Sequence, residues 1–118
     1  MQGLHLTSDL KGCRLTTLFT DCQALRTLCL QAVQDCGLTP VGELFHRFAA
    51  GAGVTGVVLL AESHLAVHTW PELAAVTIDI YVCNFSADNS RRAEDLLATL
   101  ETAFTPASVH RHRLVRGA

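Results

Sequence analysis

The chain has 118 residues, of which 49% are hydrophobic and 17% are charged, and its formal net charge is −2 at pH 7. This composition excludes a disordered chain and a basic nucleic-acid-binding surface. The length predicts a single domain, which is expected to need a second subunit to complete a complex active site.

The sequence indicates neither a membrane protein nor a secreted one. No apolar segment reaches the ~20 residues of a membrane span, and residues 1–12 lack a charged run followed by an apolar block. The five cysteines form no C-x-x-C pair, which argues against a disulfide framework and a zinc ribbon. Cys22, Cys29 and Cys36 lie seven residues apart, as buried cysteines on one helical stripe would. We expect a cytoplasmic protein with reduced thiols.

The first third of the chain predicts a strand followed by a helix. Residues 3–10 alternate between apolar and polar side chains, as in a half-buried strand. Apolar residues then recur with helical spacing over 21–36. Thr20 and Gln23 resemble a capping box at the start of this helix, and Gly37 can close it.

The rest of the chain predicts a run of strands, a second helix and a last strand. The strand-like segments are 41–48, 54–60, 64–69 and 75–83. Residues 88–104 place apolar side chains on one helical face, and Pro106 ends that helix. Residues 108–117 alternate again, with basic side chains that are expected to cover a sheet edge or a subunit contact.

This order of elements predicts an α+β fold, a two-layer α/β sandwich in which two helices pack on one face of an antiparallel sheet. The segment 76–83 sets apolar residues against polar ones, and so does 64–68. We expect the helices to cover the apolar sides, while the polar sides face a cavity or a partner subunit.

The central stretch 61–72, AESHLAVHTWPE, holds most of the candidate chemistry. A serine hydrolase would use Ser63 and a histidine base, but no G-x-S-x-G elbow is present. A metal site would use His64 and His68, whose backbones would lie about 13 Å apart in a regular strand. Alternatively, both histidines simply flank a core strand that Trp70 anchors.

The ordered string as a whole resembles the self-processing site of the prokaryotic S-adenosylmethionine decarboxylases, whose signature is E-S-H-[apolar]-x-[apolar]-H-T-W-P-E. The match is to Glu62, Ser63, His64, Leu65, Val67, His68, Thr69, Trp70, Pro71 and Glu72. Further resemblance lies in GLHLTSDLKGC at 3–13, FHRF at 45–48, GVTGVVLLAESH at 53–64 and TIDIYVC at 77–83.

The resemblance implies a proenzyme that cuts itself between Glu62 and Ser63 into a β chain, 1–62, and an α chain, 63–118. The Ser63 hydroxyl would attack the preceding carbonyl in an N-to-O acyl shift. β-Elimination and hydrolysis would then convert residue 63 into a covalent pyruvoyl cofactor. The substrate amine would form a Schiff base with this group and lose carbon dioxide.

The family's functional residues map onto particular positions of this chain. By resemblance, His68 is the base for β-elimination, Cys83 is the proton donor to the decarboxylated intermediate, and Thr55 supports processing where the family usually has serine. Glu72 resembles the carboxylate that binds the ribose hydroxyls, and Phe48 the aromatic ring that stacks on adenine. Strict alternation places Ser63 opposite to His64 and His68, so we expect the chain to bend or break at Ser63.

Two departures from the family pattern fall near the expected pocket. Residues 49–53, AAGAG, replace a Ser-Pro-Tyr-Gly run of close relatives, and Asn84 stands where glycine is frequent. They leave a pyruvoyl-dependent ornithine or arginine decarboxylase as an alternative, although no additional acidic cluster lies near the motif to receive a cationic side chain.

The resemblance therefore predicts an S-adenosylmethionine decarboxylase that yields the aminopropyl donor for spermidine biosynthesis. It implies a homodimer of cleaved pairs with active sites at the interface and no metal. An alternative from another class is an unprocessed pseudoenzyme that serves as a regulatory subunit. The joint presence of Ser63, His68 and Cys83 argues against it, because a binding module needs no such trio.

Overall fold

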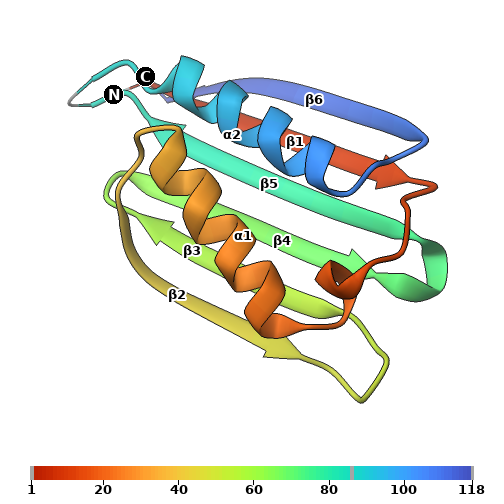
Figure 1. Cartoon of the computed structure of the whole chain (residues 1–118). Helices are drawn as coiled ribbons and strands as arrows, with labels where there is room; N and C mark the ends of the chain where they lie inside the picture. The colour runs from red at the N-terminus through yellow and green to blue at the C-terminus, as the bar shows by residue number, and fades with distance from the viewer. Residues whose placement is uncertain (1, 86, 118) are drawn as a thin grey trace.

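One six-stranded antiparallel sheet forms the body of the computed structural model, which describes residues 2–85 and 87–117 (Figure 1). Its strand order is β2-β3-β4-β5-β1-β6, so the first strand of the chain lies between the last two. The strands are β1 (Gln2–Lys11), β2 (Pro40–Arg47), β3 (Val54–Leu60), β4 (Ser63–Trp70), β5 (Ala75–Cys83) and β6 (Ser108–Gly117).

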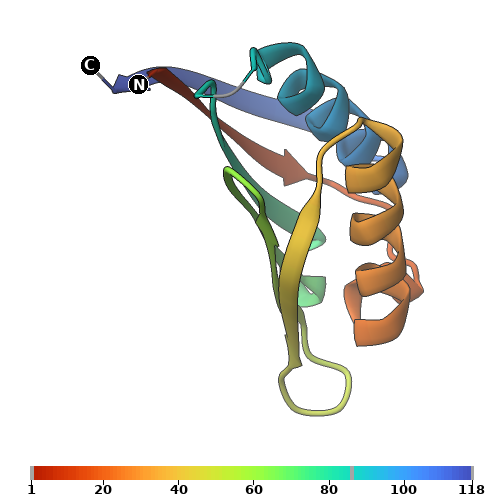
Figure 2. The same cartoon turned by 90° about the vertical axis from the view of Figure 1, so that its left-hand side faces the viewer.

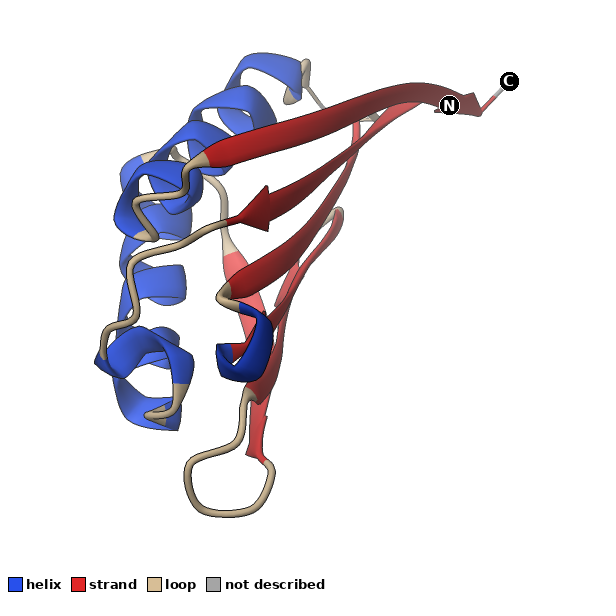
Figure 3. Ribbon diagram, turned by 90° about the vertical axis from the view of Figure 1, so that its right-hand side faces the viewer, coloured by secondary structure: helices blue, strands red, loops and turns tan. Residues whose placement is uncertain are grey.

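Two α-helices, α1 (Cys22–Asp35) and α2 (Ser90–Ala103), lie side by side on one face of the sheet (Figures 2 and 3). Two short 3-10 helices complete the described elements, η1 (Thr17–Phe19) and η2 (Pro71–Leu73). The predicted α+β sandwich is confirmed. The first and last residues of every predicted strand and helix lie within two residues of the observed boundaries. No helix among the described residues combines the length and apolarity that a membrane crossing requires.

The core lies between the helices and what we call the helix-covered face of the sheet. In β5 the alternate residues Val76, Ile78, Ile80 and Val82 are buried there. The residues between them are partly exposed on the opposite side, which we call the open face. Burial of apolar surface at about 25 cal/mol per Å² makes this division of the strand energetically decisive.

Helix α1 begins differently from the prediction. Asp21, not Thr20, is its N-cap, and the Asp21 carboxylate accepts hydrogen bonds from the backbone N–H groups of Gln23 (2.9 Å) and Ala24 (3.3 Å). Thr20 instead ends η1. The capping-box prediction was therefore wrong, because the preceding 3-10 turn delays the start of the helix by one residue.

The cysteine stripe of α1 packs against the core as predicted. Cys29 is fully buried, and burial raises the pKa of its thiol to about 12. Cys22 and Cys36 are partly buried against the same core. All five cysteines of the chain are free thiols.

Strand β6 forms an exposed edge that an ionic network fastens to α2. Arg111 donates to Glu101 through Nε (2.8 Å) and Nη2 (2.5 Å), and the Ser8 hydroxyl donates to the same carboxylate at 2.7 Å. Burial alone would raise the pKa of Glu101, but hydrogen bonds from Arg111 and Ser8 hold that pKa below its usual value. The predicted basic edge strand thus uses one arginine to anchor itself to the helix layer.

Candidate active site

Thr55 and His68 lie directly opposite each other where β3 pairs with β4. The Thr55 hydroxyl Oγ1 is 3.1 Å from His68 Nδ1, within hydrogen-bond distance. Opposed residues of an antiparallel pair share a face, and these two lie on the open face. The pairing fixes the orientation of the imidazole ring, as a proton-transferring histidine requires.

A hollow of 210 Å³ adjoins this pair and contains both predicted substrate-binding residues. Phe48 directly follows β2, and Glu72 comes from η2. The remaining lining residues are Ala52, Gly53, Thr55, His68, Thr69 and Trp70. An aromatic ring and a carboxylate in one hollow can bind a flat heterocycle and a hydroxyl-bearing sugar.

The loop with the AAGAG departure forms one wall of this hollow. Gly53 permits the close approach of β4, because a Cβ there would lie 2.0 Å from the carbonyl oxygen of Thr69. The Phe48 N–H donates to the Gly53 carbonyl at 3.1 Å, which closes the loop. Phe48 is consequently held at the mouth of the hollow, where it is 54% exposed.

The predicted cleavage site lies at the other end of β4. Glu62 is in the turn between β3 and β4, and Ser63 is the first residue of β4. The Ser63 hydroxyl donates a hydrogen bond to the Glu62 carbonyl oxygen. This contact places the serine oxygen beside the peptide group that it would attack.

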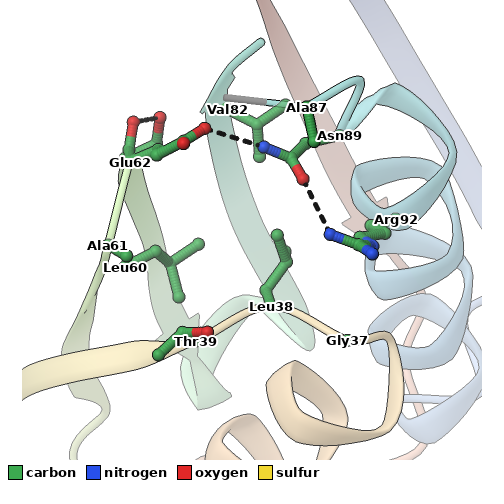
Figure 4. Close-up of a pocket in the computed structure, with 11 residues that line it drawn as sticks. Gly37, Leu38, Thr39, Leu60, Ala61, Glu62, Val82, Ala87, Asn89 and Arg92 are labelled. Carbon is green, nitrogen blue, oxygen red and sulfur yellow. Dashed lines mark hydrogen bonds between the residues drawn. The ribbon is translucent and has the colours of Figure 1, made fainter. Parts of the chain in front are cut away.

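Ser63 faces the helix-covered side of the sheet. It pairs with Leu60, which is buried on that side. Ser63 also lines a cavity of 140 Å³ to which Asn89 and Arg92 contribute (Figure 4). The predicted opposition of Ser63 to His64 and His68 is therefore confirmed. The predicted bend at Ser63 is wrong for the uncut chain, because β4 pairs with β3 in one continuous register from Ser63 to His68.

Cys83 ends β5 at the same end of the sheet as Ser63. Its side chain follows the alternation of β5 onto the open face, opposite to Ser63 in the uncut chain. His68 lies five residue steps along the extended strand from Ser63, about 17 Å at a rise of ~3.4 Å per residue. One chain therefore places Ser63 and Cys83 at one end of the sheet and His68, Thr55, Phe48 and Glu72 at the other.

Two polar residues beside the cleavage turn were missed in the sequence. Asn89 is only 5% exposed and donates to the Glu62 carboxylate at 2.9 Å, while Arg92 Nη1 donates to Asn89 Oδ1 at 3.1 Å (Figure 4). Both belong to the polar start of α2, a pattern that in the sequence is typical of ordinary helix capping, although the Asn89 side chain makes no capping hydrogen bond. Their signal in the sequence was Asn84, one of the two departures, whose side-chain oxygen accepts from the Asn89 N–H at 2.8 Å.

No group of three or more His, Cys, Asp or Glu side chains in the described parts of the chain is arranged to hold a metal ion. His64 and His68, the pair weighed for such a site, oppose Leu59 and Thr55 respectively on β3. His64 instead lies near the Tyr81 ring, with ring centroids 5.9 Å apart.

Similarity to known proteins extends over nearly the whole chain. The family model described as S-adenosylmethionine decarboxylase matches residues 4–117. The chain belongs to the S-adenosylmethionine decarboxylase family. The match includes both ends of the sheet and every candidate site residue.

Individual relatives cover most of the chain. The S-adenosylmethionine decarboxylase proenzyme of Archaeoglobus fulgidus is 36% identical over 115 residues, which are 98% of this chain and 97% of that protein. The proenzyme of Symbiobacterium thermophilum is 40% identical over 98 residues, 83% of this chain and 73% of that protein. The crystal structure of adenosylmethionine decarboxylase from Aquifex aeolicus superposes with a TM-score of 0.87 and 31% identity, covering 98% of this chain and 91% of that chain.

Proposed function

We propose that this member of the family is a self-cleaving, pyruvoyl-dependent S-adenosylmethionine decarboxylase that acts as a homodimer of cleaved pairs. The observation that carries the proposal is the contact of the Ser63 hydroxyl with the Glu62 carbonyl, inside the motif at 62–72. The family's relatives are named proenzymes, which supports a maturation step.

The maturation step begins with Ser63 Oγ. Its attack on the Glu62 carbonyl carbon forms an ester, breaks the amide bond to the Ser63 nitrogen, and transfers the hydroxyl proton to the released amine. Removal of the Ser63 α-proton then expels the Glu62 carboxylate. Water hydrolyses the resulting enamine with loss of ammonia, so that residue 63 ends as a pyruvoyl group.

The residues around Ser63 fit this cofactor. Ser63 is partly exposed at the start of a strand and lines a cavity of 140 Å³, so a new chain end has space to form and move. A pyruvoyl group supplies a carbonyl that condenses with the substrate amine and accepts the electrons released on decarboxylation. Once the 62–63 bond is cut, residue 63 is free to turn past the strand end toward the open face.

Cys83 is the proposed proton donor to the α-carbon of the decarboxylated substrate. It lies on the open face at the end of the sheet where residue 63 would emerge, and its backbone carbonyl is held by Asn89 at 3.0 Å. A thiol on a strand end held in this way can deliver its proton to one carbon of a bound substrate.

A second copy of the chain is proposed to complete each site. Within one chain, about 17 Å of strand separates Ser63 from His68. The open face also carries exposed apolar side chains such as Leu44, Leu59 and Leu114, which a stable monomer rarely presents together. A two-fold arrangement of facing sheets brings the Ser63 and Cys83 end of one copy to the His68 and Thr55 end of the other.

S-adenosylmethionine suits the hollow at that second end. Phe48 can stack on the adenine ring, and the Glu72 carboxylate can accept hydrogen bonds from the ribose hydroxyls. The product would be the aminopropyl donor of spermidine synthesis. Five free thiols suit the reducing cytoplasm, which is the proposed location.

Intact-protein mass spectrometry under reducing, denaturing conditions tests the proposal. We expect two fragments divided at Glu62/Ser63, with the second fragment blocked by pyruvoyl at its amino end. Carbon dioxide release from S-adenosylmethionine, but not from ornithine or arginine, would establish the substrate. A single uncut chain of 12.7 kDa would contradict the proposal and favour an unprocessed regulatory subunit.

A further inference from the structure

One side-chain amide joins the cleavage turn to the end of β5. Asn89 Nδ2 donates at 2.9 Å to Oε2 of Glu62 (Figure 4). The same nitrogen donates at 3.0 Å to the carbonyl oxygen of Cys83. Asn89 is 5% exposed, so water competes little for these hydrogen bonds. The residue before the cut and the residue that ends β5 are therefore tied to the same nitrogen.

The amide of Asn89 is itself held in one orientation. Its Oδ1 accepts from Arg92 Nη1 at 3.1 Å, which leaves Nδ2 to face the Glu62 carboxylate. Its backbone N–H donates to Asn84 Oδ1 at 2.8 Å, and Asn84 Nδ2 donates to Ser90 at 3.2 Å. The network thus holds both the backbone and the side-chain amide of Asn89 in place.

Arg92 reaches Asn89 past the end of α1. Gly37 follows that helix with a φ of +86°, and a Cβ at this position would lie 3.3 Å from Arg92 Nε. Arg92 and Ser63 line the same cavity of 140 Å³. The guanidinium is therefore linked to the cleavage turn through its hydrogen bond to Asn89.

We propose that Asn89 is a positioning residue for self-cleavage, held in place by Arg92. This inference rests on the proposed function, because it concerns the geometry of the Glu62–Ser63 peptide. The attack requires the Glu62 carbonyl carbon to stay in line with Ser63 Oγ, and a misplacement of about 1 Å can cost about a hundredfold in rate. Anchoring the Glu62 side chain restricts rotation of the residue whose carbonyl reacts.

The first variant to test is Asn89→Asp. It keeps the size of the side chain and its acceptor for Arg92, but it removes the Nδ2 donor and places a second carboxylate beside Glu62. Cleavage would be followed after cell-free synthesis by quenching samples at intervals and measuring intact chain against fragments. We expect cleavage to be slower by about tenfold or more.

A swapped pair separates positioning from a structural role. In the double variant Glu62→Gln, Asn89→Asp, the new amide at position 62 can donate to the new carboxylate at position 89, so the hydrogen bond is restored with its direction reversed. We expect the double variant to cleave faster than Asn89→Asp alone. The single variant Glu62→Gln is measured as well, so that the four cleavage rates form a double-mutant cycle. A merely structural Asn89 would leave the double variant as slow as the single one, and that result would overturn the inference.

Two arginines on the same helix turn provide a matched comparison. Arg91 points to solvent and pairs with Asp95, so Arg91→Ala is expected to cleave at the wild-type rate, whereas Arg92→Ala is expected to be several-fold slower. Equal cleavage rates for these two variants would overturn the role of Arg92. If circular dichroism shows that Asn89→Asp is unfolded, the comparison of Arg91→Ala with Arg92→Ala tests the inference in its place. If the wild type cleaves and Asn89→Asp cleaves at the same rate, only this inference is overturned. If the wild-type chain stays uncut, the proposed function is overturned as well.

Discussion

The hydroxyl of Thr55 lies 3.1 Å from Nδ1 of His68 across the β3–β4 ladder, and the two residues are paired in the register of the sheet. The strand pairing itself therefore holds the proposed base in one orientation. Substitutions of Thr55, where the resemblance leads us to expect a serine, measure how much this hydrogen bond contributes.

Thr55→Val removes the hydroxyl and keeps the shape of the side chain. We expect self-cleavage to slow by about tenfold or more, because the imidazole loses its hydrogen-bond partner. Thr55→Ser should cleave at least as fast as the wild type. Thr102→Val serves as the control. It also removes a threonine hydroxyl, which donates to the Ala98 carbonyl on the exposed side of α2, away from the site. Unchanged cleavage in Thr55→Val would remove Thr55 from the processing machinery.

Cys83→Ala should separate maturation from turnover. We expect normal division into fragments 1–62 and 63–118, since the thiol takes no part in the acyl shift. Decarboxylation should fall by about a hundredfold or more, the usual contribution of a positioned proton donor. Carbon dioxide release measures the effect, and Cys22→Ala, a partly exposed cysteine at the start of α1, is the control. Normal cleavage together with unchanged turnover would withdraw the assignment of Cys83.

Shared sites should allow two inactive variants to complement each other. In a dimer of His68→Ala and Cys83→Ala copies, one site combines the intact Cys83 end of the first with the intact His68 end of the second. Random co-assembly of equal amounts should recover about a quarter of wild-type activity, since half the dimers are mixed and half their sites are intact. Each variant alone should retain about a hundredth of that activity or less. Complete absence of recovery in co-expressed material would show that each chain forms its site alone.

The anchorage of β6 should depend on pH through Glu101. Its folded-state pKa is lowered from 4.5, so the unfolded chain binds a proton more readily and the carboxylate stabilises the folded state above about that pH. That contribution is lost as the pH falls below 4.5 through the lower folded-state pKa. Glu101→Gln should reduce the free energy of unfolding by about 1–3 kcal/mol at pH 7 and by less near pH 3. Denaturant unfolding at both pH values measures the difference, and a loss independent of pH would contradict the ionic origin.

Periodicity in the sequence was sufficient to predict the fold. The alternation in β5 and the helical spacing in α1 reflect burial on one side, which the structure confirms. The Thr20 capping box failed because Asp21 competes for the same role one residue later. Such choices depend on the entering turn, and local sequence does not specify the path of that turn.

The candidate site was predictable as a set of residues but not as an arrangement. The motif at 62–72 named Ser63 and His68, and the resemblance of residues 77–83 named Cys83. Alternation placed Ser63 and His68 on opposite faces. The bend expected at Ser63 assumed that one chain brings them together, whereas the continuous register keeps them apart. Asn89 escaped notice because a polar residue at a helix start is normal, and its contact with Glu62 spans 27 residues of sequence.

The strand order makes the proposed cut harmless to the integrity of the molecule. Fragment 1–62 would contain β1, β2 and β3, and fragment 63–118 would contain β4, β5 and β6. In the sheet, β1 lies between β5 and β6, so the two fragments interleave and cannot part without breaking backbone hydrogen bonds on three strand boundaries. Cutting the β3–β4 hairpin would thus produce a non-covalent heterodimer whose two chains are interleaved from the start. The new chain end at residue 63 could then take part in chemistry while the sheet around it stays paired.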